Sequence, residues 1–128
     1  MDKEPCKVLV VDEDRDNTDT TVMLLQMWGH EAEPAYSAEE AIPKAKSFDP
    51  DVILIDLGRP VANGFSLANR LREHCPEAKL VAITAFTATD IVPRTRQAGF
   101  EKVLLKPAPA KRIKEAVDAE CASSSSDA

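Results

Sequence analysis

The sequence is poor in long hydrophobic runs and has no excess of positive charge. Its longest apolar runs are four residues, and its start, MDKEPCK, lacks the pattern of a secretory signal. A membrane helix needs roughly 20 apolar residues. The 16 basic and 22 acidic residues leave a net charge of -6, which argues against binding to nucleic-acid phosphates. These absences predict a cytoplasmic protein that neither inserts into a membrane nor binds nucleic acid directly.

Cysteine and histidine are also scarce. Cys6, Cys75 and Cys121 are odd in number and widely spaced, which fits neither a disulfide framework nor a pair of zinc ligands. The sequence therefore predicts reduced thiols, with Cys6 and Cys75 filling space in the interior. The two histidines, His30 and His74, are expected at the surface.

The length of 128 residues predicts one domain, which would bury roughly two-thirds of the surface of its unfolded chain. A hydrophobic content of 44% is ordinary for a globular protein. Because only 5% of the residues are aromatic, the core must consist mainly of Val, Ile, Leu and Ala.

Short apolar runs recur along the chain with helical patterns between them. The runs lack the polar alternation of half-exposed strands, so they predict strands buried on both faces. They are 8–11, 52–55, 80–83 and 103–105. A weaker strand over 31–36 contains Pro34, which cannot donate a ladder hydrogen bond, so this strand is expected at a sheet edge.

Helix signals follow each predicted strand. Ser37 and Glu40 have the spacing of a capping box, Thr89 and Asp90 are expected to open another helix, and the last helix follows Pro109. Five βα repeats predict an α/β fold with a doubly wound parallel sheet, in the flavodoxin-like strand order 2-1-3-4-5. We expect residues 1–120 to form this domain and the serine-rich residues 121–128 to be a disordered tail.

Charged and hydroxyl side chains follow the predicted strands at their carboxyl ends. They are Asp12 and Glu13, then Asp56, Thr84 and Lys106. Parallel strands end at one edge of a sheet, so these groups are expected to converge there. Three clustered carboxylates need a counter-charge, and Mg²⁺ prefers such oxygen ligands. A carboxylate beside a metal, a hydroxyl and an ammonium is the set of groups that supports phosphoryl transfer through an aspartyl phosphate.

Four segments carry a resemblance to a known family. VLVVDED, DVILIDLGRPVANG, LVAITAF and KVLLKP, in this order and spacing, resemble the receiver domain of two-component response regulators, over about residues 6–120. Pro60 and Gly64, four and eight residues beyond Asp56, agree with it. The form of these segments is similar both to free-standing chemotaxis-type receivers and to the receivers of hybrid sensor kinases.

The resemblance implies a role for each acidic residue at this edge. Asp56 would accept a phosphoryl group from a phosphohistidine on a histidine kinase or a histidine phosphotransfer protein. Asp12, Glu13, Asp56 and the main-chain carbonyl of Gly58 would hold Mg²⁺. Glu13 is one methylene longer than the aspartate usual at its position. Such a domain is a signalling module that assists only its own phosphorylation and dephosphorylation.

The resemblance also implies how the phosphorylated state is held. Thr84 and Lys106 would each bind a phosphoryl oxygen, and the Lys106–Pro107 peptide bond would be cis. Val103 stands where the family commonly has Tyr or Phe in its switch. The surface expected to change on phosphorylation lies around the fourth helix, the fifth strand and the fifth helix.

Two other functions are open at this point. Asp12-Glu13-Asp14 after the first strand also fits the Asp-x-Asp pattern of haloacid-dehalogenase-like phosphatases, in which Asp12 would be the nucleophile. The altered acidic pair is also compatible with an interaction domain that is not phosphorylated.

Gly58 and Phe86 flank the expected in-line path to the phosphoryl group, two residues beyond Asp56 and Thr84. Glycine leaves one side open, so we predict that Phe86 shields the other side and sets the lifetime of the phosphorylated state. Phe86→Ala should then change the dephosphorylation rate, measured by loss of the acyl phosphate. An unchanged rate would contradict this role.

Overall fold

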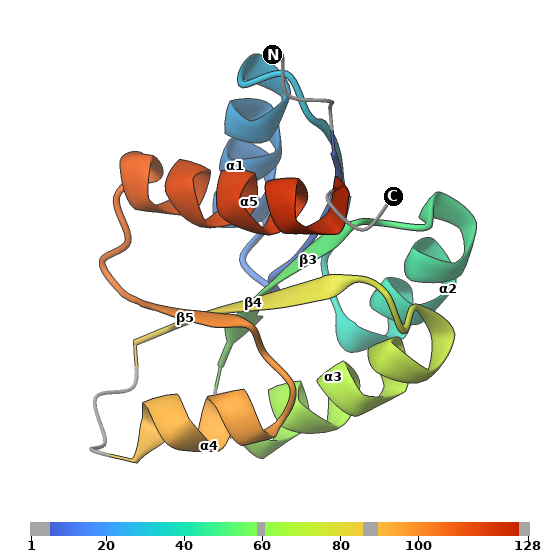
Figure 1. Cartoon of the computed structure of the whole chain (residues 1–128), viewed down its shortest axis with the longest axis vertical. Helices are drawn as coiled ribbons and strands as arrows, with labels where there is room; N and C mark the ends of the chain where they lie inside the picture. The colour runs from blue at the N-terminus through green and yellow to red at the C-terminus, as the bar shows by residue number, and fades with distance from the viewer. Residues whose placement is uncertain (1–5, 59–60, 86–89, 126–128) are drawn as a thin grey trace.

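The computed structural model describes residues 6–58, 61–85 and 90–125. Over these residues strands and helices alternate along the chain: β1 Lys7–Val11, α1 Arg15–Met27, β2 Glu31–Ala35, α2 Ala38–Phe48, β3 Val52–Leu57, α3 Val61–His74, β4 Lys79–Thr84, α4 Ile91–Gln97, β5 Lys102–Leu105 and α5 Ala110–Ser125. The strands form one parallel sheet in the order β2-β1-β3-β4-β5 (Figure 1). The predicted flavodoxin-like fold and its strand order are confirmed.

Both faces of the sheet are covered by helices. α1 and α5 cover one face, and α2, α3 and α4 cover the other (Figure 1). Along β3, Ile53 and Ile55 belong to the core beneath α2–α4, whereas Val52 and Leu54 belong to the core beneath α1 and α5. This arrangement explains why the strand sequences show no polar alternation. None of the helices in the described ranges is long and apolar enough to span a membrane.

The edge position predicted for the proline-containing strand is confirmed. β2 lies at one end of the strand order, and Pro34 is in register with Val10 of β1. An edge strand needs ladder hydrogen bonds on one side only, so a residue without an N–H group is tolerated there.

Local signals in the sequence form the expected helix starts. Ser37 Oγ accepts a hydrogen bond from the Glu40 N–H at 3.2 Å, and Glu40 Oε1 accepts one from the Tyr36 N–H at 3.1 Å. Ser37 therefore caps α2 as predicted, but Glu40 bonds to the Tyr36 N–H and not to the Ser37 N–H of a full capping box, and α2 continues through Pro43. At α1 the Asp14 carboxylate caps the helix by accepting from the Asn17 N–H at 3.2 Å. Asp90 precedes α4 as expected.

The prediction of a buried, reduced thiol is confirmed for Cys75, but the predictions for Cys6, Cys121 and His30 were wrong. Cys6 and Cys121 form a disulfide with a Cα–Cα distance of 5.9 Å, and only Cys75 is a free, buried thiol. His30 is only 8% exposed rather than at the surface, whereas His74 is exposed as expected. Sequence separation had suggested that Cys6 and Cys121 lie apart, but α5 returns along the sheet and brings its end back to the start of β1.

The last helix overlaps the start of the segment 121–128, which the sequence predicts to be a disordered tail. α5 continues to Ser125. The physical reason is that Cys121 lies four residues beyond Val117 and eight beyond Ile113, on the helix face that is buried against the sheet. Burial of Cys121 and its disulfide therefore extend the ordered helix into the serine-rich segment.

Because the core depends on the central strand, truncation of a side chain in β3 should be costly. Ile53 is fully buried, so Ile53→Ala is expected to lower the free energy of unfolding by about 2–5 kcal/mol. Met23, on α1, is 61% exposed, and Met23→Ala should change it by less than about 0.5 kcal/mol. Urea denaturation followed by circular dichroism measures both, and equal effects would contradict this view of the core.

Candidate functional site

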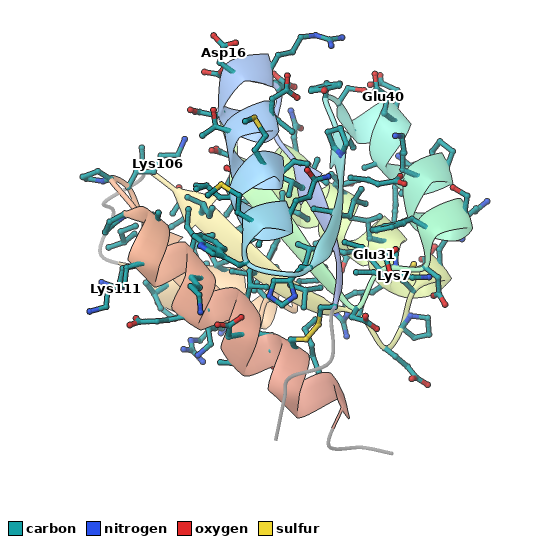
Figure 2. All side chains as sticks on the ribbon, turned by 90° about the horizontal axis from the view of Figure 1, so that it is seen from above. Lys7, Asp16, Glu31, Glu40, Lys106 and Lys111 are labelled. Atoms are coloured by element: carbon teal, nitrogen blue, oxygen red, sulfur yellow. A yellow bond between two sulfur atoms is a disulfide. The ribbon has the colours of Figure 1, made fainter. Side chains whose placement is uncertain are left out.

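The carboxyl ends of the strands bring the predicted residues to one edge of the sheet. Asp12 directly follows β1 and Lys106 directly follows β5, while Asp56 and Thr84 lie in the last two positions of β3 and β4. Thr84 is in register with Leu57 on one side and with Leu105 on the other. Lys106 is seen at the end of the molecule where α5 begins (Figure 2).

Lys106 forms an ion pair with Asp56. Its Nζ lies 2.5 Å from Asp56 Oδ2, and the Asp56 side chain is only 15% exposed. Burial alone would lower the pKa of Lys106, but the hydrogen bond to Asp56 and the charges of Asp56 and Asp12 outweigh it and raise the pKa. The lysine is therefore a permanent cation held against Asp56.

The backbone around this ion pair is also well defined. The Lys106 N–H donates a hydrogen bond to the Thr84 carbonyl oxygen at 2.8 Å. The Lys106–Pro107 peptide bond is cis, as the resemblance implied. Thr84 is fully buried. The two residues expected to bind phosphoryl oxygens are thus joined by a main-chain hydrogen bond.

Asp12 is the second carboxylate beside Asp56. Burial raises the pKa of Asp12 to about 6, the hydrogen bond from the Asp14 N–H to Asp12 Oδ1 at 3.0 Å opposes the shift, and the nearby charge of Asp56 adds to it. Asp56 is therefore close enough to disfavour the ionised form of Asp12. Negative charge is therefore crowded here, and Lys106 offsets only part of it.

Thr18 positions the acidic loop, a role that the sequence reasoning missed. Its Oγ1 donates to the carbonyl oxygens of Asp12 at 2.8 Å and Asp14 at 2.7 Å, and the residue is fully buried. A threonine early in a helix often bonds to the backbone of the preceding turn, which was the available signal.

The donor groups fit a hard divalent cation. A cavity of about 330 Å³ at this edge is lined by Asp12, Glu13, Asp56 and Gly58, together with Asn63, which the sequence reasoning did not identify. These residues offer only oxygen and amide groups, which suit Mg²⁺ and not a thiophilic metal. Burial and the nearby charge of Asp56 raise the pKa of Asp12, and a cation beside these carboxylates would oppose both effects.

Val103 and Phe86 are the two residues expected to modulate the site. Val103 lies in β5, in register with Ala82 of β4, and is partly buried. Val103 therefore lies on the fifth strand, at the position where the family commonly has Tyr or Phe. Phe86 lies outside the described residues.

Residues 8–118 match the family model of the response regulator receiver domain. This chain belongs to that family. The receiver is 33% identical over 107 residues to a response regulator receiver protein of Anaeromyxobacter sp. (strain Fw109-5), covering 84% of this chain and 45% of that protein. It is 35% identical over 81 residues to the response regulator VraR of Staphylococcus aureus, covering 63% of this chain and 39% of that protein. The receiver thus spans less than half the length of these relatives.

Solved structures agree with this assignment of the fold. A CheY-like receiver domain from Methanospirillum hungatei superposes with a TM-score of 0.87 at 22% identity, covering 98% of this receiver and all of that chain. The chemotaxis protein CheY4 of Vibrio cholerae gives a TM-score of 0.81 at 25% identity, covering 91% and 98% of the two chains. The receiver is therefore a signalling module of two-component systems, and the family match decides against the haloacid-dehalogenase interpretation.

The crowded carboxylates predict a stabilising substitution. In a chelating buffer at pH 7, Asp12→Asn should raise the free energy of unfolding by about 1 kcal/mol, because the ionised Asp12 is disfavoured in the folded state and solvent screens part of that cost. In the wild type, stability should rise as the pH falls from 7 to 5, because the folded state then binds the additional proton.

Urea denaturation across this pH range measures both effects. Asp16→Asn, on the exposed start of α1, is the control and should leave the pH dependence unchanged. A lower stability of Asp12→Asn in the chelating buffer would contradict this account of the electrostatics.

Proposed function

We propose that this receiver accepts a phosphoryl group on Asp56 from a phosphohistidine of a histidine kinase or a histidine phosphotransfer protein. The observation that carries the proposal is the ion pair of Asp56 with Lys106 at 2.5 Å, beside a second carboxylate in an oxygen-lined cavity. An ammonium so close to the acceptor is positioned to bind the oxygens of an incoming phosphoryl group.

The transfer itself requires few groups. A carboxylate oxygen of Asp56 bonds to phosphorus while the P–N bond to the imidazole breaks, and the imidazole leaves with the electron pair and takes up a proton. Lys106 moves its hydrogen bond from the carboxylate to a phosphoryl oxygen. Thr84, at the end of the neighbouring strand, supplies a hydroxyl donor to another.

Asp12, Glu13, Asp56 and the Gly58 carbonyl would hold Mg²⁺ in this cavity. When bound, the ion would offset the negative charge of the carboxylates and of the transferred phosphoryl group. Asp12 and the loop that follows it are kept in place by Thr18, so the acidic residues need no large rearrangement.

Phosphorylation would change partner binding through the surface formed by α4, β5 and α5. Drawing Thr84 and Lys106 toward a doubly charged group would bias α4, β5 and α5, which follow these residues in the chain. The output would be a changed interaction with a downstream protein, and the exchange with the kinase would take place in the cytoplasm. With Val103 in place of an aromatic residue, the signal would pass without the family's usual side-chain swing.

The proposal predicts one covalent product. Incubation with Mg²⁺ and a small acyl phosphate or phosphoramidate donor should add one phosphoryl group, lost on treatment with hydroxylamine, as measured by intact mass. Asp56→Asn should abolish the label, and Asp16→Asn, on α1, should retain it. Chelation of Mg²⁺ should reduce the labelling rate by tenfold or more.

The alternatives give different results in the same experiment. Label on Asp12 would support phosphatase-type chemistry and contradict the proposal. Absence of label with both the small donor and a phosphorylated histidine kinase would support an interaction domain that is not phosphorylated.

A further inference from the structure

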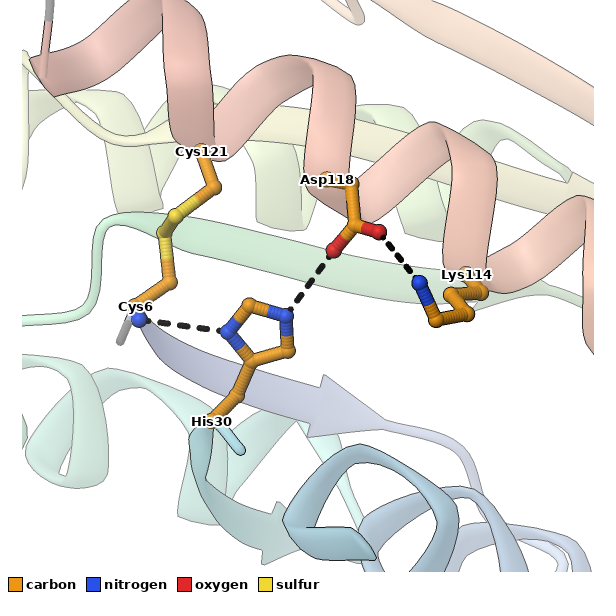
Figure 3. Close-up of polar contacts among 5 residues, drawn as sticks. All are labelled: Cys6, His30, Lys114, Asp118 and Cys121. Atoms are coloured by element: carbon orange, nitrogen blue, oxygen red, sulfur yellow. Dashed lines mark hydrogen bonds and ion pairs between the residues drawn. A yellow bond between two sulfur atoms is a disulfide. The ribbon is translucent and has the colours of Figure 1, made fainter. Parts of the chain in front are cut away.

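A disulfide joins two parts of the chain that are 115 residues apart in sequence. Cys6 directly precedes β1, and Cys121 lies near the end of α5 (Figure 3). Both residues are buried, with exposed fractions of 3% and 6%. The bond lies at the opposite end of α5 from Lys106, so it takes no direct part in the acidic site (Figure 2).

His30 forms a second, non-covalent connection between the same two elements. Its Nδ1 accepts a hydrogen bond from the Cys6 N–H at 3.2 Å, and its Nε2 lies 3.1 Å from Asp118 Oδ1 (Figure 3). Because a backbone N–H can only donate, the ring proton sits on Nε2 and is donated to Asp118. Lys114 Nζ donates to the other Asp118 oxygen at 2.8 Å.

We propose that Cys6 and Cys121 are a reversible dithiol–disulfide site that locks the C-terminal turns of α5 to the start of β1 when it is oxidised. The oxidant is a disulfide of the glutathione class. One cysteine thiolate attacks this disulfide and releases one thiol, and the second cysteine then attacks the mixed disulfide and releases the other. Two electrons and two protons thus pass from the protein to two small thiols, and one S–S bond replaces another.

The reduced state remains folded because other contacts hold α5. Ile113 and Val117 stay buried against the sheet, and the hydrogen bonds of His30 to Cys6 and Asp118 do not require the S–S bond. Helix ends open more readily than central strands, so Cys121 becomes accessible to a thiol without global unfolding. Reduction is therefore expected to loosen one end of α5 rather than to unfold the domain.

The side chains of Cys6, His30 and Cys121 could alternatively form a metal site. A ring nitrogen of His30 and the sulfurs of Cys6 and Cys121 all lie within 4.8 Å of one another, a set that would suit Zn²⁺ if both cysteines were thiolates. The S–S bond consumes both thiolates, so the geometry favours the disulfide. Metal content is accordingly one outcome of the test.

The whole chain is equilibrated in mixtures of reduced and oxidised glutathione, and thiols are counted by alkylation and intact mass. We expect one reactive thiol, Cys75, after unfolding the oxidised protein and three in the reduced protein. The thermal midpoint should fall on reduction by roughly 10 °C, because the bond closes nearly the whole chain into a loop. Cys75→Ser is the matched control and should keep this redox shift, whereas Cys121→Ser should lose it.

Hydrogen exchange separates local loosening from a general loss of stability. On reduction, the amides of residues 114–121 in α5 should exchange about tenfold faster through local opening, while those of β3 and β4, which open only with the whole domain, should remain the most protected amides in both states. His30→Ala should accelerate this exchange further in the reduced protein and much less in the oxidised one, because the disulfide then holds the same two elements.

Three results would each overturn the proposal. They are three reactive thiols at every glutathione ratio, equal thermal midpoints in the two redox states, and stoichiometric zinc that is lost in Cys6→Ser. None of these measurements requires a phosphoryl donor, so the outcome is independent of whether Asp56 is phosphorylated.

Discussion

The arrangement of this molecule depends on a parallel sheet that is buried on both faces. The central strands β1, β3 and β4 must be apolar on both sides, so their polar residues can appear only near their ends. Parallel strands place all their carboxyl ends at one edge, and the order β2-β1-β3-β4-β5 makes β1, β3 and β4 neighbours there. The site is thus a consequence of the way in which the core is built.

Within that site, the carboxylates of Asp12 and Asp56 and the ammonium of Lys106 determine the electrostatics. The charge of Asp56 disfavours the ionised state of Asp12, and Lys106 compensates Asp56 directly. Carboxylates crowded in this way tolerate their own charge poorly, and a small cation would offset it. In the proposed function, the same imbalance would prepare the edge for a ligand that brings both a cation and phosphoryl oxygens.

Much of the fold and of the site could be predicted from the sequence because both depend on local patterns. The apolar runs predicted a parallel sheet buried on both faces, and Pro34 predicted which strand lies at its edge. The positions just after the predicted strands pointed to Asp56 and Lys106. The contact between those two side chains could not be derived from spacing, because it depends on how far β5 reaches along β4. Thr18 was missed because a buried threonine in a helix resembles ordinary core packing.

The cluster around His30 shows a different limit. Cys121 was expected in a tail, although it continues the four-residue spacing of Ile113 and Val117 along the buried face of the last helix. The spacing does not reveal how long α5 is relative to the sheet, and this length decides where the helix ends. The contacts of His30 with Cys6 and Asp118, and the disulfide, form because the end of α5 reaches the start of β1.

The position of the disulfide also has a mechanical consequence. Cys6 and Cys121 enclose nearly all of the described chain, so a pulling force applied to its two ends would pass through one covalent bond instead of through the hydrogen bonds of β1. In the oxidised protein the sheet and its acidic edge would carry almost none of that tension. After reduction the same force would act first on the last turns of α5 and on the link through His30.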